Sequence, residues 1–154
     1  FNGFDSCTLS LNSFEPDTFA LVHGVRAMPD VGAIVAAARM PLKLSCILTQ
    51  HNSGAEHAAR YLEPCRRHGV RRVAFRQLFG VERDADAEDP FAALTPSTSH
   101  CGNPVYSVDG VEVTHWVFDT TTGQSLNLFA DGTLSEHYRL DQAAPSSRAA
   151  EAQE

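Results

Sequence analysis

Apolar residues are spaced differently in the two halves of the chain. In the first half, segments rich in apolar residues at 7–12, 41–48 and 70–79 alternate with segments whose apolar positions recur every three or four residues. Short runs of this kind are typical of buried strands, and the longer spacing is typical of amphipathic helices. From residue 104 onward, apolar and polar residues alternate singly, which indicates strands with one exposed face.

Helix signals fill the gaps between the three apolar runs. A first helix is expected after residue 13 and should end at Gly24, because glycine readily takes the left-handed conformation that closes a helix. Asp30 can cap a second helix. A third helix is expected over residues 55–68, with Gly69 as its terminator.

The segment 41–80 reads as a strand, a polar loop, a helix and a second strand. This order predicts a βαβ unit with parallel strands and a right-handed crossover. Ligands of parallel α/β folds bind at the carboxyl ends of the strands, so residues 49–52 and 76–80 are the first places to expect a site.

The second half predicts hairpins. Asp109-Gly110 and Asp131-Gly132 are strong two-residue turn signals between alternating segments. With a further turn near Gly123, they predict a small antiparallel β-meander of four strands over residues 104–140. Residues 81–103, acidic and then rich in Pro, Ser and Thr, are expected to form a linker or lid, and residues 141–154 a disordered tail.

Length and charge limit the class of protein. The 154 residues suit one modest domain, or a fragment of a larger protein, and are too few for a complete eight-stranded α/β barrel. A formal charge of −7 argues against an extended nucleic-acid or anionic-membrane surface. Because neither a membrane-spanning apolar run nor a signal peptide is recognisable, a cytoplasmic location is expected.

Generic catalytic motifs are sparse. The four cysteines form no CxxC pair, which excludes a zinc knuckle, and Cys7, Cys46 and Cys65 are expected to be small buried side chains. The seven histidines form no HxxxH or HxH motif. Cys101 with His100 or His115 is an alternative nucleophile pair, although side chains of adjacent residues do not ordinarily face each other. A phosphate-handling barrel enzyme is disfavoured, since no Gly-rich phosphate loop is present.

Three segments in order resemble one enzyme family. The segment 4–24 contains Ser-Leu-Asn followed by Phe-Glu-Pro-Asp-Thr-Phe and a glycine, the segment 41–48 reads Pro-Leu-Lys-Leu-Ser-Cys-Ile-Leu, and the segment 70–79 is a third apolar strand. Together they resemble the fourth, fifth and sixth strands of radical S-adenosylmethionine enzymes. The resemblance covers about half of the chain. It implies an open partial (β/α) barrel with three parallel strands over residues 1–80.

The resemblance also implies roles for particular residues. Side chains that would approach S-adenosylmethionine are Ser10, Asn12, Ser45 and Gln77. Lys43 and Arg76 would face a small-molecule or peptide substrate. These types suit the task, because hydroxyl and amide groups can orient a zwitterion and a ribose, while Lys and Arg can hold a carboxylate or phosphate.

The chain departs from that family in one essential part. The CxxxCxxC loop that holds the four-iron four-sulfur cluster is absent, so this chain alone is not expected to catalyse the family reaction. The expectation is a C-terminal portion of such an enzyme, which needs a missing N-terminal half or self-association at the exposed edge of residues 7–12. The alternative is a non-catalytic protein-binding or assembly module.

Overall fold

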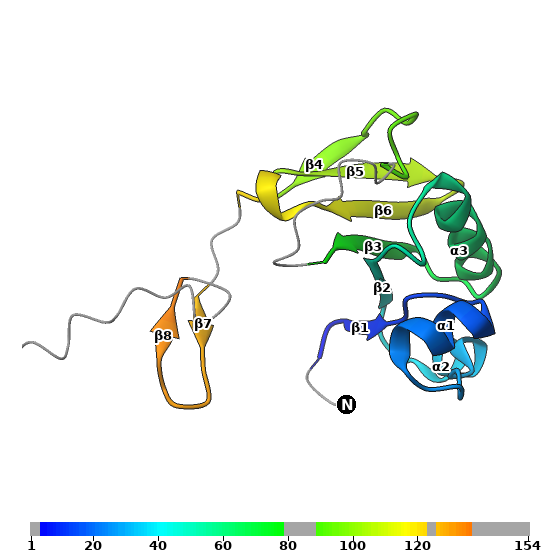
Figure 1. Cartoon of the computed structure of the whole chain (residues 1–154), viewed down its shortest axis with the longest axis horizontal. Helices are drawn as coiled ribbons and strands as arrows, with labels where there is room; N and C mark the ends of the chain where they lie inside the picture. The colour runs from blue at the N-terminus through cyan, green and yellow to red at the C-terminus, as the bar shows by residue number, and fades with distance from the viewer. Residues whose placement is uncertain (1–3, 79–88, 123–125, 137–154) are drawn as a thin grey trace, which may run out of the picture. The chain divides into compact units, whose positions relative to one another are not determined.

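The computed structural model describes residues 4–78, 89–122 and 126–136 (Figure 1). The chain divides into two compact units, residues 1–121 and residues 122–154. In unit 1 the elements are β1 (Cys7–Ser10), α1 (Pro16–His23), α2 (Val31–Ala37), β2 (Leu42–Leu48), α3 (Ala55–Arg67), β3 (Arg72–Gln77), β4 (Thr98–His100), β5 (Asn103–Val108), β6 (Val111–Trp116) and the short 3-10 helix η1 (Phe118–Thr120). Unit 2 contains β7 (Asn127–Leu128) and β8 (Leu134–Ser135).

Unit 1 is built on one six-stranded mixed sheet with the order β1-β2-β3-β6-β5-β4. Strands β1, β2, β3 and β6 run parallel to their neighbours, whereas β5 and β4 continue the sheet in antiparallel fashion. The expected α/β class and the three parallel strands of the first half are therefore confirmed. The strand order does not test whether the sheet curves into a barrel, so the partial barrel stays a prediction.

The second half of the chain is arranged differently from the expectation. The hairpin at Asp109-Gly110 is confirmed, with φ of 49° and 80° at the two turn residues. The single four-stranded meander is wrong, because β5 and β6 join the main sheet while β7 and β8 form a separate two-stranded sheet. The reason is packing: Val111 and Val113 of β6 are fully buried, and pairing with β3 places them in the same core.

The regions around this hairpin depart from the expectation as well. Strand β4 lies in the stretch expected to be a linker or lid. Residues 79–88, 137–140 and the expected tail at 141–154 lie outside the described residues.

The ends of the helices follow local signals. Gly24 closes α1 with φ of 70°, as expected. The side chain of Asp30 accepts a hydrogen bond from the backbone N–H of Ala33 at 2.9 Å, which confirms the expected cap of α2. Helix α3 begins after Gly54 and is followed by Gly69 with φ of 78°.

All three helices of unit 1 pack on one face of the sheet. The connections from β1 to β2 and from β2 to β3 advance in the same direction across the sheet, so right-handed crossovers place α1, α2 and α3 on the same side. The core between them is formed by buried residues that include Phe19, Leu44, Tyr61, Cys65 and Phe75. No described helix covers the opposite face of this sheet, which we call the open face.

Candidate functional site

A row of small side chains crosses the open face from one edge of the sheet to the other. The strand registers place in one line Ser10, Ser45, Ala74, Thr114, Val105 and Thr98. Successive residues of a strand point to opposite faces, so each member of this row is flanked on its own strand by residues two positions away. Ser45 and Ala74 are only 4% and 5% exposed, which indicates that larger neighbours shield them.

Longer side chains form a bank on each side of this row. One bank contains Lys43, Arg72 and Glu112, and the Nε atom of Arg72 lies 3.1 Å from a carboxylate oxygen of Glu112. The other bank contains Arg76 and Trp116, which are register partners on β3 and β6. Between the banks lies a cavity of about 290 Å³, which we call the trough; its lining includes Lys43, Arg72, Ala74, His100, Thr114 and Trp116.

Four of the six expected site residues meet on the open face. Ser10 and Ser45 are direct register partners at the carboxyl end of β1 and the middle of β2. Lys43 and Arg76 lie on opposite banks, and both are partly buried. Neither of these two cations forms an ion pair with a described residue. Two unpaired cations beside serine hydroxyls can bind an anionic or zwitterionic molecule.

The other two expected residues have different surroundings. The side-chain oxygen of Asn12 accepts a hydrogen bond from the backbone N–H of Ile47 at 2.8 Å, and Asn12 is 8% exposed. Gln77 lies on the helix-covered face, two positions after Phe75, and its side-chain oxygen accepts a hydrogen bond from the backbone N–H of Phe118 at 3.2 Å. In this structure both amides hold the backbone, and of the six expected residues Lys43 lines the trough.

Asn52 is a structural residue that the sequence did not single out. Its amide nitrogen donates to the carbonyl oxygens of Asn12 and Ile47 at 2.9 and 2.8 Å, while its side-chain oxygen accepts from the backbone N–H of Thr49 at 2.6 Å. Asn52 is 1% exposed. The loop at residues 49–52, where a ligand was expected, therefore uses its central polar group to tie the ends of β1 and β2 together.

One thiol and imidazole lie close together beside the trough. The Sγ atom of Cys101 is 3.7 Å from the Nε2 atom of His100, in the tight turn between β4 and β5 where Cys101 has φ of 50°. His115, the other candidate partner, lies instead against Asp89, with its Nδ1 atom 3.4 Å from the carboxylate. Adjacent residues thus do meet here, because the turn folds one side chain towards the other.

The other three cysteines differ in how far they are buried. Cys46 and Cys65 are fully buried, as expected, and burial raises the pKa of Cys65 to about 12 and raises that of Cys46 further. Cys7 is exposed, contrary to the expectation, because β1 is the edge strand of the sheet. Burial also lowers the pKa of His57, whose Nε2 atom has no hydrogen-bond partner among the described residues.

The described residues do not fit an iron-sulfur cluster. Within residues 4–78, 89–122 and 126–136, no group of three or more His, Cys, Asp or Glu side chains is arranged to hold a metal ion. A thiolate-bound cluster would therefore need ligands from elsewhere. Among the described helices, none has both the length and the apolar character needed to span a bilayer.

Comparisons with known proteins found no match among protein-family models, curated proteins or solved structures. The chain is therefore classified by its own architecture: an α/β unit with helices on one face of a mixed sheet and a polar trough on the other. Its function has to be argued from that trough.

Proposed function

We propose that this chain is the C-terminal portion of a radical S-adenosylmethionine enzyme and forms one wall of its cofactor and substrate cavity. The observation that carries the proposal is the meeting of Ser10, Lys43, Ser45 and Arg76 on one uncovered face of three parallel strands. In a partial (β/α) barrel the helices cover the outside and the opposite face of the strands lines the cavity, so this one-sided arrangement is what the proposal requires.

The chemistry of these four residues supports a binding role. The exposed hydroxyl of Ser10 can accept or donate hydrogen bonds to an amino acid or ribose group. Lys43 and Arg76, unpaired within the described chain, can hold carboxylate or phosphate groups. S-adenosylmethionine would supply the radical chemistry only in the presence of the cluster, for which the described residues offer no ligand set. The role proposed for the chain is to bind and orient the cofactor and substrate.

Titration calorimetry with S-adenosylmethionine tests the cofactor site. Replacing Ser10 by Ala should weaken binding about three- to tenfold, since one hydrogen bond from a neutral hydroxyl contributes about 0.5–1.5 kcal/mol. Ser107→Ala is the matched control, because Ser107 is an exposed serine of β5, a strand that pairs with neither β1 nor β2. The control variant should bind like the wild type.

The coding sequence upstream of Phe1 gives an independent test. A CxxxCxxC motif there would support the enzyme, and the longer protein should then bind the cofactor more tightly than this chain. Absence of S-adenosylmethionine binding to that longer protein, or equal binding by Ser10→Ala and the wild type, would remove the assignment.

The second candidate is a non-catalytic assembly module, and the free edge of the sheet favours it. Within the described residues β1 pairs only with β2, and Cys7, Thr8 and Ser10 are exposed. An unpaired strand edge presents backbone donors and acceptors to another chain. This candidate requires association through β1 and no binding of S-adenosylmethionine.

A further inference from the structure

We propose that the trough binds an elongated small molecule with an anionic group at one end and a planar ring at the other, as in a nucleoside monophosphate. This inference rests on the proposed function for the catalytic use of the ligand, but the binding itself can be tested separately. It concerns mainly β4, β5 and β6, which the proposed cofactor site does not use.

The floor of the trough suits a hydroxylated ligand. Ala74, Thr114, Val105 and Thr98 continue the row of small side chains beyond β3 as far as the edge strand β4. Small side chains leave space above the sheet, whereas the residues two positions away on either side are mostly long. The threonine hydroxyls can exchange hydrogen bonds with sugar hydroxyls lying over them.

The bank of the trough that contains Lys43 is cationic. Lys43 is the only lysine of the chain and has no carboxylate partner among the described residues. Arg72, beside it, is already paired with Glu112, so this pair adds no net charge. This bank therefore carries the uncompensated positive charge of Lys43, which favours a phosphate or carboxylate.

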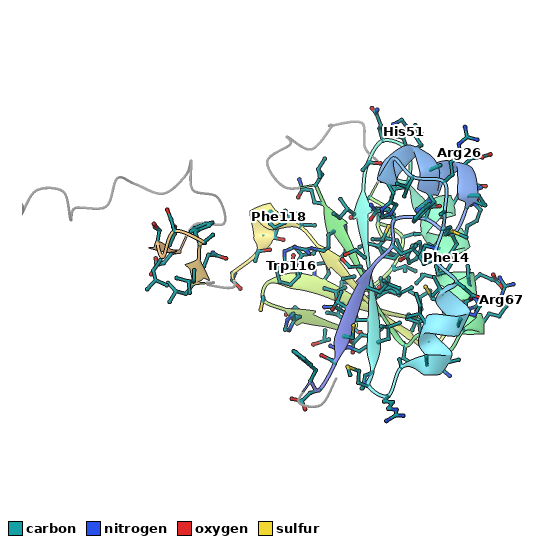
Figure 2. All side chains as sticks on the ribbon, turned by 90° about the horizontal axis from the view of Figure 1, so that it is seen from below. Phe14, Arg26, His51, Arg67, Trp116 and Phe118 are labelled. Atoms are coloured by element: carbon teal, nitrogen blue, oxygen red, sulfur yellow. The ribbon has the colours of Figure 1, made fainter. Side chains whose placement is uncertain are left out.

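The opposite bank contains the aromatic side chain of Trp116. Trp116 lines the trough, and its ring centroid lies 6.2 Å from that of His100. Figure 2 shows Trp116 on the side of the molecule away from Phe14 and Arg67, which belong to the helix-bearing side. A planar heterocycle stacked on the indole ring would gain apolar and aromatic contact there.

The separation of Lys43 and Trp116 indicates how long the ligand can be. Lys43 and Trp116 differ by four residues along the strands and by two strand spacings across the sheet. These steps correspond to about 16 Å between the Cα atoms. A base, a sugar and a phosphate in line can span this separation. The cavity of about 290 Å³ is near the lower limit of ligand sites, which excludes a much larger molecule.

The chain contains one tryptophan, so its fluorescence reports directly on the trough. We expect adenosine 5′-monophosphate to change the emission of Trp116 saturably, with a Kd of about 1 mM or tighter. Adenosine, which lacks the anion, should bind at least about tenfold more weakly. Ribose 5-phosphate, which lacks the ring, should leave the emission of Trp116 unchanged.

Two variants assign the binding to the trough. Lys43→Met should remove the preference for adenosine 5′-monophosphate over adenosine, whereas Arg26→Met, which removes an exposed cation between α1 and α2, should retain it. Circular dichroism checks that both variants are folded. Ser10→Ala should bind the nucleotide like the wild type, which separates this site from the proposed cofactor site.

The inference is overturned by any of three results: no saturable change with adenosine 5′-monophosphate, equal affinity for adenosine, or an unchanged preference in folded Lys43→Met.

Discussion

Burial divides the titratable side chains of this protein into two groups with different behaviour. Cys46, Cys65 and Tyr61 lie in the core, and desolvation of their charged forms raises the pKa of each. Cys7 and Cys101 are exposed and remain accessible to reagents. The sequence supplies the thiols, and packing decides that Cys46 and Cys65 are buried with a raised pKa.

The raised pKa values predict a loss of stability at alkaline pH. An unfolded cysteine titrates near 9.0 and folded Cys65 at about 12, so above pH 9 the unfolded state binds fewer protons than the folded state. The contribution of Cys65 to the free energy of unfolding should therefore be constant below about pH 9 and fall as pH rises towards 12, by up to about 1.4 kcal/mol per pH unit.

Urea unfolding at about pH 7.5 and about pH 10.5 measures this effect. Cys65→Ala should reduce the difference between the two conditions, even though the smaller side chain lowers stability at both. Equal free energies of unfolding for the wild type under both conditions would contradict the prediction.

The carboxyl ends of β1 and β2 are joined by a polar network rather than left open. Asn52 connects the carbonyl groups of Asn12 and Ile47, and the hydroxyl of Tyr61 donates to the carbonyl of Leu11 at 2.7 Å. Buried polar groups of this kind are costly when one partner is removed. At the scale of elements, the network holds the two parallel strands and the start of α3 in fixed positions.

Asn52→Ala should reduce the free energy of unfolding by about 2–4 kcal/mol, because it leaves two carbonyl groups and one backbone N–H without their partner. Thermal and urea unfolding of the variant measure the loss. Ser53→Ala, at the neighbouring exposed position, should change stability by less than about 0.5 kcal/mol. A loss of the same small size in Asn52→Ala would show that the network does not stabilise the fold.

At the scale of the whole molecule, the free edge of β1 is the feature that favours association. Cys7 and Leu11 donate their backbone N–H groups to Pro41 and Ser45 on β2. Successive residues of a strand direct their N–H groups to alternate sides, so Thr8, next to Cys7, presents its N–H to the free edge. An additional strand, from a second copy or from another part of a longer protein, can pair there.

The free edge predicts an oligomer that Thr8→Pro dissociates. Proline removes the outward N–H while leaving the donors of Cys7 and Leu11 in place. Multi-angle light scattering over a range of concentrations should show association of the wild type and of the control Thr8→Val, which keeps the N–H, but a monomer for Thr8→Pro. A wild-type monomer at every concentration would count against association through this edge.

Local signals were sufficient for the first half of the chain. Runs of apolar residues identified β1, β2 and β3, and Asp30, Gly24 and the Asp109-Gly110 turn set element boundaries as expected. These signals depend on a few neighbouring residues, because capping, left-handed φ angles and strand alternation are local properties. Strand alternation also placed Lys43 and Ser45 on one face of β2, opposite Leu44 and Cys46.

Contacts between residues that are distant in the sequence could not be predicted from these local signals. The parallel contact of β6 with β3, the strand β4, the exposure of Cys7 and the backbone roles of Asn12 and Gln77 all depend on which segment lies alongside another. Hydrophobic spacing, caps and turns were enough to predict most of the helices and strands and the alternation of the strand faces. The order of the sheet, with β6 parallel to β3 and with β5 and β4 added in antiparallel fashion, and the trough lined by five of its strands depend on the burial of whole faces against distant segments.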